Sequence, residues 1–203
     1  MLNKNLINKN NKRKIIFPIL KKNNKLLEIE LYFQSLIFKL KTDQLTGIMN
    51  KESFIQDINF LSNEKNYSSR NKFAIIFIDL NGFKKINDIN GHQVGDEILK
   101  IIAKRMQSEL REFDLIARFG GDEFVIYLNE MDNLQSAQEI IDRLHLCIEK
   151  TINIPDADLI NVGASFGIAI CPNDGLDLDS LIRTADKRMY EKKFNKKSDL
   201  QLN

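Results

Sequence analysis

The segment that most restricts the fold is an apolar run that ends in an acid, KFAIIFIDL at residues 72–80. A continuous run of this length, rich in isoleucine and phenylalanine, predicts a strand that is buried at the centre of a sheet. The acid at its end, Asp79, is an unusual residue for such a position, because an unpaired buried carboxylate is costly. This end of the predicted sheet is therefore a candidate site.

Patterns on either side of this strand predict the rest of the domain. The expected elements are a helix from about residue 50, a long helix over 93–110, two strands around a tight turn within 115–128, a helix over 133–150, a strand over 160–170 and a final helix over 177–194, which an aspartate can cap. We expect Phe54, Ile58 and Leu61 on the buried face of the first helix, and bulges at Gly163 and Gly167 in the last strand. The βαββαβ order predicts an α+β, ferredoxin-like fold, in which an antiparallel sheet carries the core helices on one face.

Residues 1–25 differ in composition from the rest of the chain. They hold eight of its 30 basic residues and no acidic residue, so the other 22 basic residues accompany 28 acidic ones. We expect this basic arm to be disordered and solvated, although its charge could also bring it to an anionic membrane or to nucleic acid. No nucleic-acid partner is predicted for the domain itself, which we place over residues 42–198.

Residues 26–41 predict a separate helix before the domain. Ile29, Phe33, Leu36 and Leu40 follow a 4-3-4 spacing, which is the seam of a coiled coil. Two interpretations stay open: the seam pairs with a second copy of the chain, or it packs on the body of the domain.

Membrane and secretion signals are absent from the sequence as read. The apolar stretch at residues 26–40 contains Glu28, Glu30 and Lys39 and is shorter than the roughly 20 residues of a bilayer span. Cys147 and Cys171 are isolated, which is typical of reduced thiols. We therefore expect a cytoplasmic protein with no transmembrane segment.

The turn between the two predicted hairpin strands has the sequence RFGGDEFVIYL, residues 118–128. In the predicted topology this hairpin neighbours the central strand, so Asp122 would lie near Asp79. A divalent cation resolves the repulsion between such carboxylates, and Mg²⁺ prefers one or two protein carboxylates, with phosphate oxygens and water as its other ligands. Gly120 and Gly121 would let a polyphosphate approach the backbone. The hairpin therefore predicts a site for metal and phosphate.

The segment after the central strand, DLNGFKKINDINGHQVGDEIL, carries candidate base-binding groups. Asn87 and Asp96 can face one pocket. A carboxylate accepts hydrogen bonds from guanine N1–H and N2–H₂, and an amide can address O6 and N7. Adenine would leave the carboxylate unpaired, so the pair favours guanine.

These motifs resemble those of a known family. GGDEF at 120–124, preceded by RF, and F-x-x-x-N-D-x-x-G-H-x-x-G-D from Phe83 to Asp96 are similar to the GGDEF family of diguanylate cyclases. So are DQLTG at 43–47, SFGIAI at 165–170 and ADKRMY at 185–190, in the family's order. The resemblance implies a nucleotide-cyclase palm with added helices. It also implies an enzyme that condenses two GTP into cyclic di-GMP and two pyrophosphates.

The resemblance also implies a role for each matched residue. Two Mg²⁺ (or Mn²⁺) ions per active site would be held by Asp79, Asp122 and the Leu80 carbonyl, with support from Glu123. Asp122 would also act as the base for the 3′-hydroxyl, so that Asp122, Glu123 and Lys84 form the catalytic group. The substrate-binding positions are Phe83, Asn87, Asp96, Gly120, Gly121, Lys193 and Lys197, although Phe83 also suits the core. Lys84 would stabilise charge on the phosphates, and Lys193 and Lys197 would contact the triphosphate.

Assembly and regulation follow from the same resemblance. One domain holds one GTP, so catalysis requires a homodimer. The pattern R-x-x-D occurs at Arg111 and Asp114, and Arg111 lies nine residues ahead of Gly120. This is the spacing of the family's product-binding inhibitory site. An upstream sensor partner could supply the input signal. Cyclic di-GMP is thus expected as both product and inhibitor.

Two departures and two alternatives accompany this interpretation. The family usually ends A-K-x-x-G-R-N, whereas this chain has KKFNKKS, so Lys197 replaces an arginine and loses its bidentate fork. LPNR becomes IMNK at 48–51. The alternatives are a non-catalytic GTP or cyclic di-GMP receptor of the same fold, and another nucleotide cyclase or mixed-dinucleotide synthase.

Overall fold

The computed structural model describes residues 24–63, 72–131, 134–155 and 157–201. The chain divides into two units, Met1–Leu40 and Lys41–Asn203. The elements are α2 (Asn24–Lys41), β1 (Met49–Asn50), α3 (Lys51–Asn63), β2 (Phe73–Asn81), α4 (Phe83–Asn90), α5 (His92–Ser108), β3 (Leu115–Arg118), β4 (Glu123–Leu128), α6 (Leu134–Glu149), β5 (Gly163–Cys171) and α7 (Leu178–Gln201). None of the helices among the described residues is long and apolar enough to cross a membrane. The basic arm predicted for residues 1–25 lies almost entirely outside the described residues.

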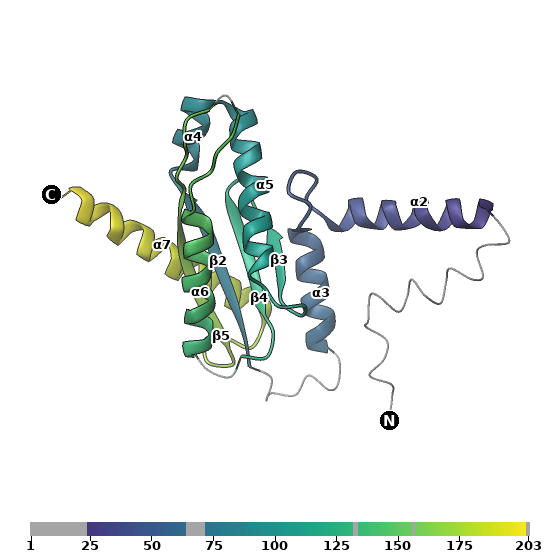
Figure 1. Cartoon of the computed structure of the whole chain (residues 1–203). Helices are drawn as coiled ribbons and strands as arrows, with labels where there is room; N and C mark the ends of the chain where they lie inside the picture. Colours follow the sequence, from purple (N-terminus) through teal and green to yellow (C-terminus); the bar gives the residue numbers. More distant parts are fainter. Residues whose placement is uncertain (1–23, 64–71, 132–133, 156, 202–203) are drawn as a thin grey trace. The chain divides into compact units, whose positions relative to one another are not determined.

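One five-stranded sheet organises the second unit (Figure 1). Its order is β1-β3-β4-β2-β5; β1 pairs with β3 in parallel, and the other pairs are antiparallel. The apolar run of residues 72–80 forms β2, which pairs with β4 on one side and β5 on the other. The sequence-based prediction of a buried central strand beside a hairpin is therefore confirmed.

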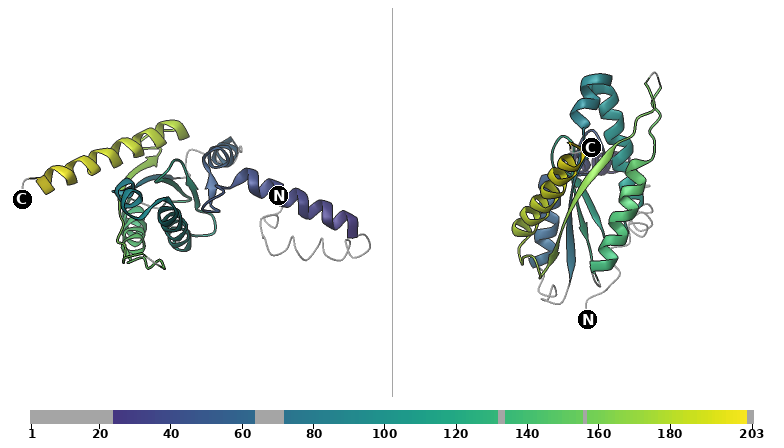
Figure 2. Two further views of the ribbon diagram at one scale, coloured as in Figure 1. Left: turned by 90° about the horizontal axis from the view of Figure 1, so that it is seen from above. Right: turned by 90° about the vertical axis from the view of Figure 1, so that its left-hand side faces the viewer.

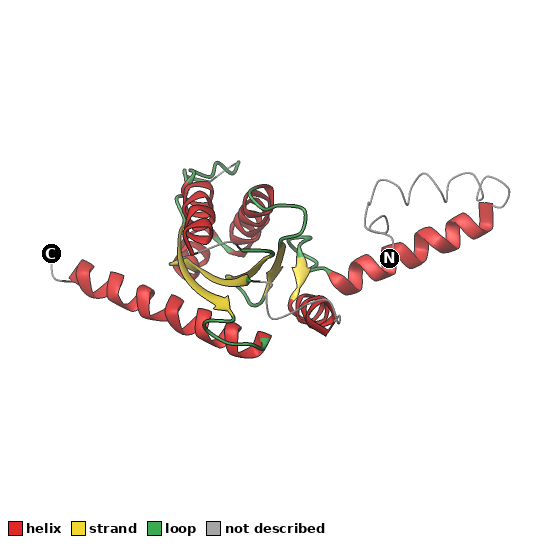
Figure 3. Ribbon diagram, turned by 90° about the horizontal axis from the view of Figure 1, so that it is seen from below, coloured by secondary structure: helices red, strands yellow, loops and turns green. Residues whose placement is uncertain are grey.

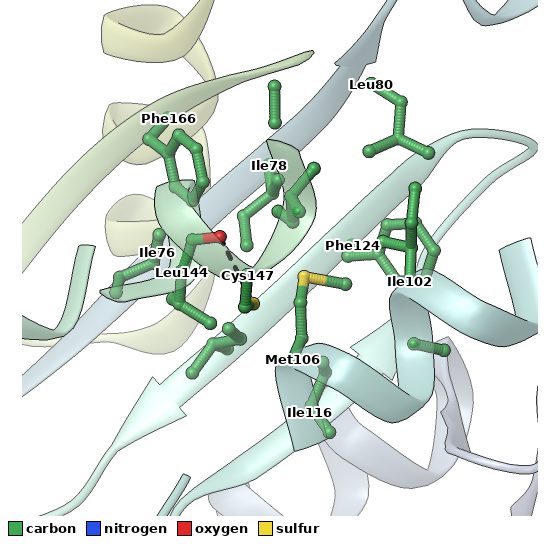
Figure 4. Close-up of a cluster of buried hydrophobic side chains, with 14 of the residues drawn as sticks. Ile76, Ile78, Leu80, Ile102, Met106, Ile116, Phe124, Leu144, Cys147 and Phe166 are labelled. Atoms are coloured by element: carbon green, nitrogen blue, oxygen red, sulfur yellow. Dashed lines mark hydrogen bonds between the residues drawn. The ribbon is translucent and has the colours of Figure 1, made fainter. Parts of the chain in front are cut away.

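Helices cover both faces of the sheet (Figures 2 and 3). The core helices α5 and α6 lie on one face, as the βαββαβ pattern predicts. The added helices α3 and α7 cover the other face and pack on a second apolar cluster. Side chains alternate along β2, so Ile76 and Ile78 belong to the first cluster and Ile75 and Phe77 to the second. Figure 4 shows the first cluster, in which Ile78 packs near Phe166.

The two glycines of β5 do not form bulges, so that part of the sequence-based prediction is wrong. β5 pairs with β2 in continuous register from Gly163 to Cys171. A Cβ at Gly167 would lie 1.9 Å from the backbone oxygen of Ala185 and 2.4 Å from the backbone nitrogen of Met189. Gly167 is therefore required because the backbone of α7 lies directly against the strand.

Gly167→Ala is expected to lower the free energy of unfolding by about 3 kcal/mol, because neither backbone can move away without displacing α7. Gly163→Ala is the matched control, since its Cβ would meet only the side chain of Asn81 at 3.4 Å. Urea titration of both variants measures the effect. Equal stability of the two variants would show that α7 is not seated on β5 at Gly167.

Two details of the helices differ from the sequence-based expectation. The segment after β2 contains a helix, α4, that the polar sequence did not predict. In α3, Phe54 and Ile58 are buried as expected, but Leu61 is exposed because the helix runs past the edge of its apolar cluster. The predicted aspartate cap of α7 is confirmed: Asp177 Oδ1 accepts a hydrogen bond from the Ser180 amide at 2.8 Å.

Helix α2 agrees with the helix predicted over residues 26–41 and carries an unusual amount of exposed apolar surface. Ile29, Phe33, Leu36 and Leu40 are 45%, 54%, 39% and 67% exposed. Other large apolar side chains of α2 are exposed as well, among them Leu31 and Phe38. Exposed apolar area of this kind is typical of surfaces that pack against another molecule or segment.

Candidate active site

Two of the predicted carboxylates lie side by side on neighbouring strands. Asp79 of β2 and Glu123 of β4 are directly opposed in the antiparallel register. Asp79 is on the same face of β2 as Ile75 and Phe77, which is the face that α7 covers. Asp79 is buried, one of very few buried polar residues in the described part of the chain. The sheet itself therefore fixes this pair at the end of β2.

The third carboxylate, Asp122, belongs to the hairpin turn, because β4 begins at the next residue, Glu123. The turn is tied to the end of β2: the Leu80 amide donates to the Asp122 carbonyl at 3.2 Å. Within the hairpin, the Phe119 amide donates to the Glu123 carbonyl at 2.9 Å. The structure thus brings Asp79, Leu80, Asp122 and Glu123 together.

The electrostatics of the cluster reflect this crowding. Burial, followed by the charge of Asp79, raises the pKa of Asp122. Burial and the charges of Asp79 and Asp122 raise the pKa of Glu123, and Asp186 adds to the effect. Carboxylates that are buried and crowded in this way form a site that attracts a cation.

Lys193 of α7 contacts this cluster directly. Its Nζ donates a hydrogen bond to Oδ1 of Asp79 and forms an ion pair with it. Lys193 and Lys197 both lie on α7, as their spacing predicted, but the side chain of Lys197 lies outside the described residues. The sequence alone gave no sign that Lys193 would reach Asp79.

Arg118 holds the glycine turn in place, a role that sequence reasoning missed. Its Nη2 donates to the Gly121 carbonyl at 2.8 Å and its Nε to the Gly120 carbonyl at 3.1 Å. Its Nη1 reaches Asp43 Oδ1 at 3.2 Å. Burial alone would raise the pKa of Asp43, but hydrogen bonds from Thr46 and Arg118 outweigh it and hold the pKa below its usual value. The only signal in the sequence was the pair of motifs in which Arg118 and Asp43 occur.

The candidate base-binding residues lie at the facing ends of α4 and α5. Asn87 Oδ1 is buried and is the one buried side-chain polar atom in the described residues that has no hydrogen-bond partner. A Cβ at Gly95 would lie 1.8 Å from that oxygen, so the missing side chain makes room for Asn87. Asp96, the next residue, is exposed. An unpaired acceptor beside an accessible carboxylate can receive a ligand with several N–H donors.

The other predicted residues occupy varied positions. Phe83 is buried in the core, Lys84 and Gly121 are exposed, and Gly120 is partly buried beneath the side chain of Glu123. At the candidate inhibitory site, Asp114 accepts from the backbone amides of Arg111 at 2.9 Å and Asn129 at 3.0 Å. Asp114 therefore shapes its own loop, and Arg111 is exposed beside it.

The donor set suits a hard divalent cation bound together with a phosphate ligand. Carboxylate and backbone carbonyl oxygens are the ligands that Mg²⁺ prefers. Among the described residues, no three His, Cys, Asp or Glu side chains converge as a complete metal cage. Mg²⁺ does not require one, since it usually keeps water and substrate phosphates among its six ligands.

Comparison with known proteins agrees with this geometry. The family model described as "Diguanylate cyclase, GGDEF domain" matches residues 40–199. Diguanylate cyclase TpbB of Pseudomonas aeruginosa is 34% identical over 156 residues, which cover 77% of this chain and 36% of TpbB. Cyclic di-GMP phosphodiesterase NbdA of the same organism is 36% identical over 152 residues, which cover 74% of this chain and 19% of NbdA.

A solved structure extends the agreement to the fold. The chain is 31% identical to a sensory box/GGDEF family protein from Caulobacter crescentus CB15, with a TM-score of 0.70. That match covers 76% of this chain and 99% of the other. The curated relatives above are much longer than the part that this chain matches. The family match over most of the domain is decisive: the chain belongs to the GGDEF family of diguanylate cyclases.

Proposed function

We propose that this protein condenses two molecules of GTP into cyclic di-GMP, releasing two pyrophosphates. The observation that carries the proposal is the cluster of Asp79, Asp122 and Glu123 at the glycine turn, which family membership alone does not guarantee. Incubation with GTP and Mg²⁺, followed by identification of the product, tests it. The domain assignment over residues 42–198 and a cytoplasmic location are part of the same proposal.

Metal binding is assigned to Asp79, Asp122 and the Leu80 carbonyl, with Glu123 in support. A bound pair of Mg²⁺ or Mn²⁺ ions would lower the pKa of the attacking hydroxyl and neutralise charge on the phosphates. Asp122 is also proposed to accept the proton of the 3′-hydroxyl. Lys84 is exposed on α4, where it can approach the departing pyrophosphate.

Guanine binding is assigned to Asn87 and Asp96. The buried Oδ1 of Asn87 has no hydrogen-bond partner among the described residues, and an N–H donor of the base, such as the N2 amino group of guanine, would satisfy it. The open backbone at Gly121 leaves room for the triphosphate, and Lys193, which contacts Asp79, is proposed as a phosphate contact. Lys197 is proposed as a second phosphate contact.

Catalysis requires two domains that face each other, and we assign their association to α2. Phe33→Glu and Leu36→Glu are expected to move the half-maximal specific activity to at least about tenfold higher protein concentration, since a buried charge in the seam is costly. Activity measured over a dilution series checks this. Ser35→Glu, on the outer side of the seam, is the control. Full activity of a concentration-independent monomer would refute the assignment.

Product inhibition is proposed at Arg111 and Asp114. Arg111 is exposed and can form two parallel hydrogen bonds to a phosphate or to the Hoogsteen edge of guanine. Arg111→Ala is expected to sustain turnover at product concentrations that stall the wild-type protein, with Glu112→Ala of the same loop as the control. Progress curves followed to high product concentration measure this. Identical stalling of wild type and Arg111→Ala would leave Arg111 with a structural role only.

The second candidate function is a non-catalytic receptor for GTP or cyclic di-GMP. The intact motif GGDEF at residues 120–124 favours the enzyme, because a non-catalytic receptor of the same fold would usually carry a damaged hairpin motif. A mixed-dinucleotide synthase is disfavoured by Asp96, whose carboxylate suits guanine. An upstream partner that supplies an input signal is compatible with the exposed apolar surface of α2.

A further inference from the structure

The ammonium group of Lys193 binds the carboxylate oxygen that a metal ion would also need. Lys193 Nζ donates to Oδ1 of Asp79, and both side chains are largely shielded from water, at 26% and 12% exposure. Shielding strengthens the attraction, because less water screens the two charges. The contact is thus less screened by water than an ordinary surface ion pair.

The position of Lys193 matters because the cluster around it is acidic. Asp122 lies in the adjoining turn, and Glu123 faces Asp79 across the strands. The charge of Lys193 opposes the effect of Asp79 on Asp122. Lys193 therefore acts as a counterion for the carboxylates. It extends from α7 through a flexible four-carbon side chain, so its ammonium group can move while the helix stays in place.

An ammonium group and a divalent cation cannot share one carboxylate without cost. Mg²⁺ requires its ligands at about 2.1 Å in octahedral geometry, so a cation on Asp79 would lie within roughly 4 Å of Lys193 Nζ. At that separation two positive charges repel strongly where water is largely excluded. Each cation therefore weakens the binding of the other.

We infer that Lys193 competes with the divalent cation for Asp79 and thereby makes tight metal binding depend on the nucleotide. The free protein binds the cation weakly, because the cation must first displace Lys193. A triphosphate offers Lys193 another anion, so that Asp79 becomes available to the cation that arrives with the nucleotide. This second step rests on the proposed function, whereas the competition itself does not.

The competition is measured with Mn²⁺ alone, by titrating nucleotide-free protein and following free Mn²⁺ by electron paramagnetic resonance. Lys193→Met is expected to bind Mn²⁺ about tenfold more tightly than wild type, the equivalent of one hydrogen bond to a charged group. Lys192→Met is the matched control: it removes the same charge from the neighbouring, exposed position of α7 and is expected to change the affinity less than about threefold. Unchanged or weaker Mn²⁺ binding by Lys193→Met would overturn the inference.

A second arm repeats the titration with the non-hydrolysable α,β-methylene analogue of GTP. In this titration the substitution is expected to have the opposite effect on affinity. Lys193→Met binds the Mn²⁺–nucleotide complex more weakly than wild type, because the wild-type lysine attracts the phosphates of the nucleotide. Tighter Mn²⁺ binding by Lys193→Met both with and without the nucleotide analogue would contradict the proposed dependence of metal binding on the nucleotide. A lysine with a merely structural role would not produce opposite shifts.

A measurement on the wild-type protein guards against a variant that fails to fold. Saturating Mg²⁺ is expected to shift the side-chain NMR signals of Lys193 and to leave those of Lys192 unmoved. Unmoved Lys193 signals would also overturn the inference. The Mn²⁺ titrations and the NMR measurement do not depend on turnover. The inference about Lys193 can therefore be wrong while the protein makes cyclic di-GMP, and it can be right in a protein that does not.

Discussion

Asp79→Asn and Asp122→Asn are each expected to lower the turnover of GTP on the order of 1000-fold or more, because an amide cannot replace an anionic ligand of a hard cation. The fold should survive both changes. Asn is nearly isosteric with Asp, and the register that places residue 79 depends on backbone hydrogen bonds of β2. Steady-state kinetics at saturating Mg²⁺, together with thermal unfolding, separate loss of chemistry from loss of structure.

Asp142→Asn, an exposed position on α6, is the matched control and should retain wild-type turnover. The Asp79 variant also loses its ion pair with Lys193, so its unfolding temperature needs to be compared with that of Lys193→Met. Near-normal turnover in either the Asp79 or the Asp122 variant would remove that residue from the metal site.

Asp96→Ala is expected to lower the preference for GTP over ATP by about 100-fold, the equivalent of two hydrogen bonds to the guanine edge. The KM for GTP should rise, because the carboxylate contributes to ground-state binding. Competition between GTP and ATP, expressed as a ratio of kcat/KM values, measures the change. The two proposed hydrogen bonds run from guanine N1–H and N2–H₂ to Asp96. Inosine triphosphate lacks the N2 amino group, so its KM with the wild-type protein should show the contribution of the N2–H₂ bond alone.

Glu97→Ala provides the control for this experiment, because Glu97 is the next residue along α5 and forms an exposed ion pair with Lys100. Its selectivity should match that of wild type. An Asp96 variant with unchanged selectivity would show that the carboxylate does not contact the base, and base recognition would then fall to Asn87 and the backbone.

Much of the fold could be predicted from the sequence where one physical effect dominates. The apolar run of residues 72–80 has to be buried, and it forms the central strand β2. Asp79 and Asp122 could be placed together because a hairpin beside that strand allows few arrangements. Asn87 and Asp96 were expected in one pocket, and the orphaned oxygen of Asn87 beside Gly95 is consistent with that.

Contacts between distant segments could not be predicted in the same way. Gly167 suggested a bulge, because the sequence does not reveal that the backbone of α7 lies against β5 at that residue. Helix α4 has eight residues, and glycines with positive φ values, Gly82 and Gly91, bound it on both sides, so its sequence is typical of a loop. The contacts of Lys193 with Asp79 and of Arg118 with Asp43 depend on packing across the domain.

The most direct test of the proposed function is to incubate the purified chain with GTP and Mg²⁺ at several protein concentrations and to identify the products. We predict cyclic di-GMP and two equivalents of pyrophosphate, with a specific activity that rises with protein concentration. Binding of GTP without formation of cyclic di-GMP, at concentrations where the chain is dimeric, would contradict the proposal and favour a nucleotide receptor.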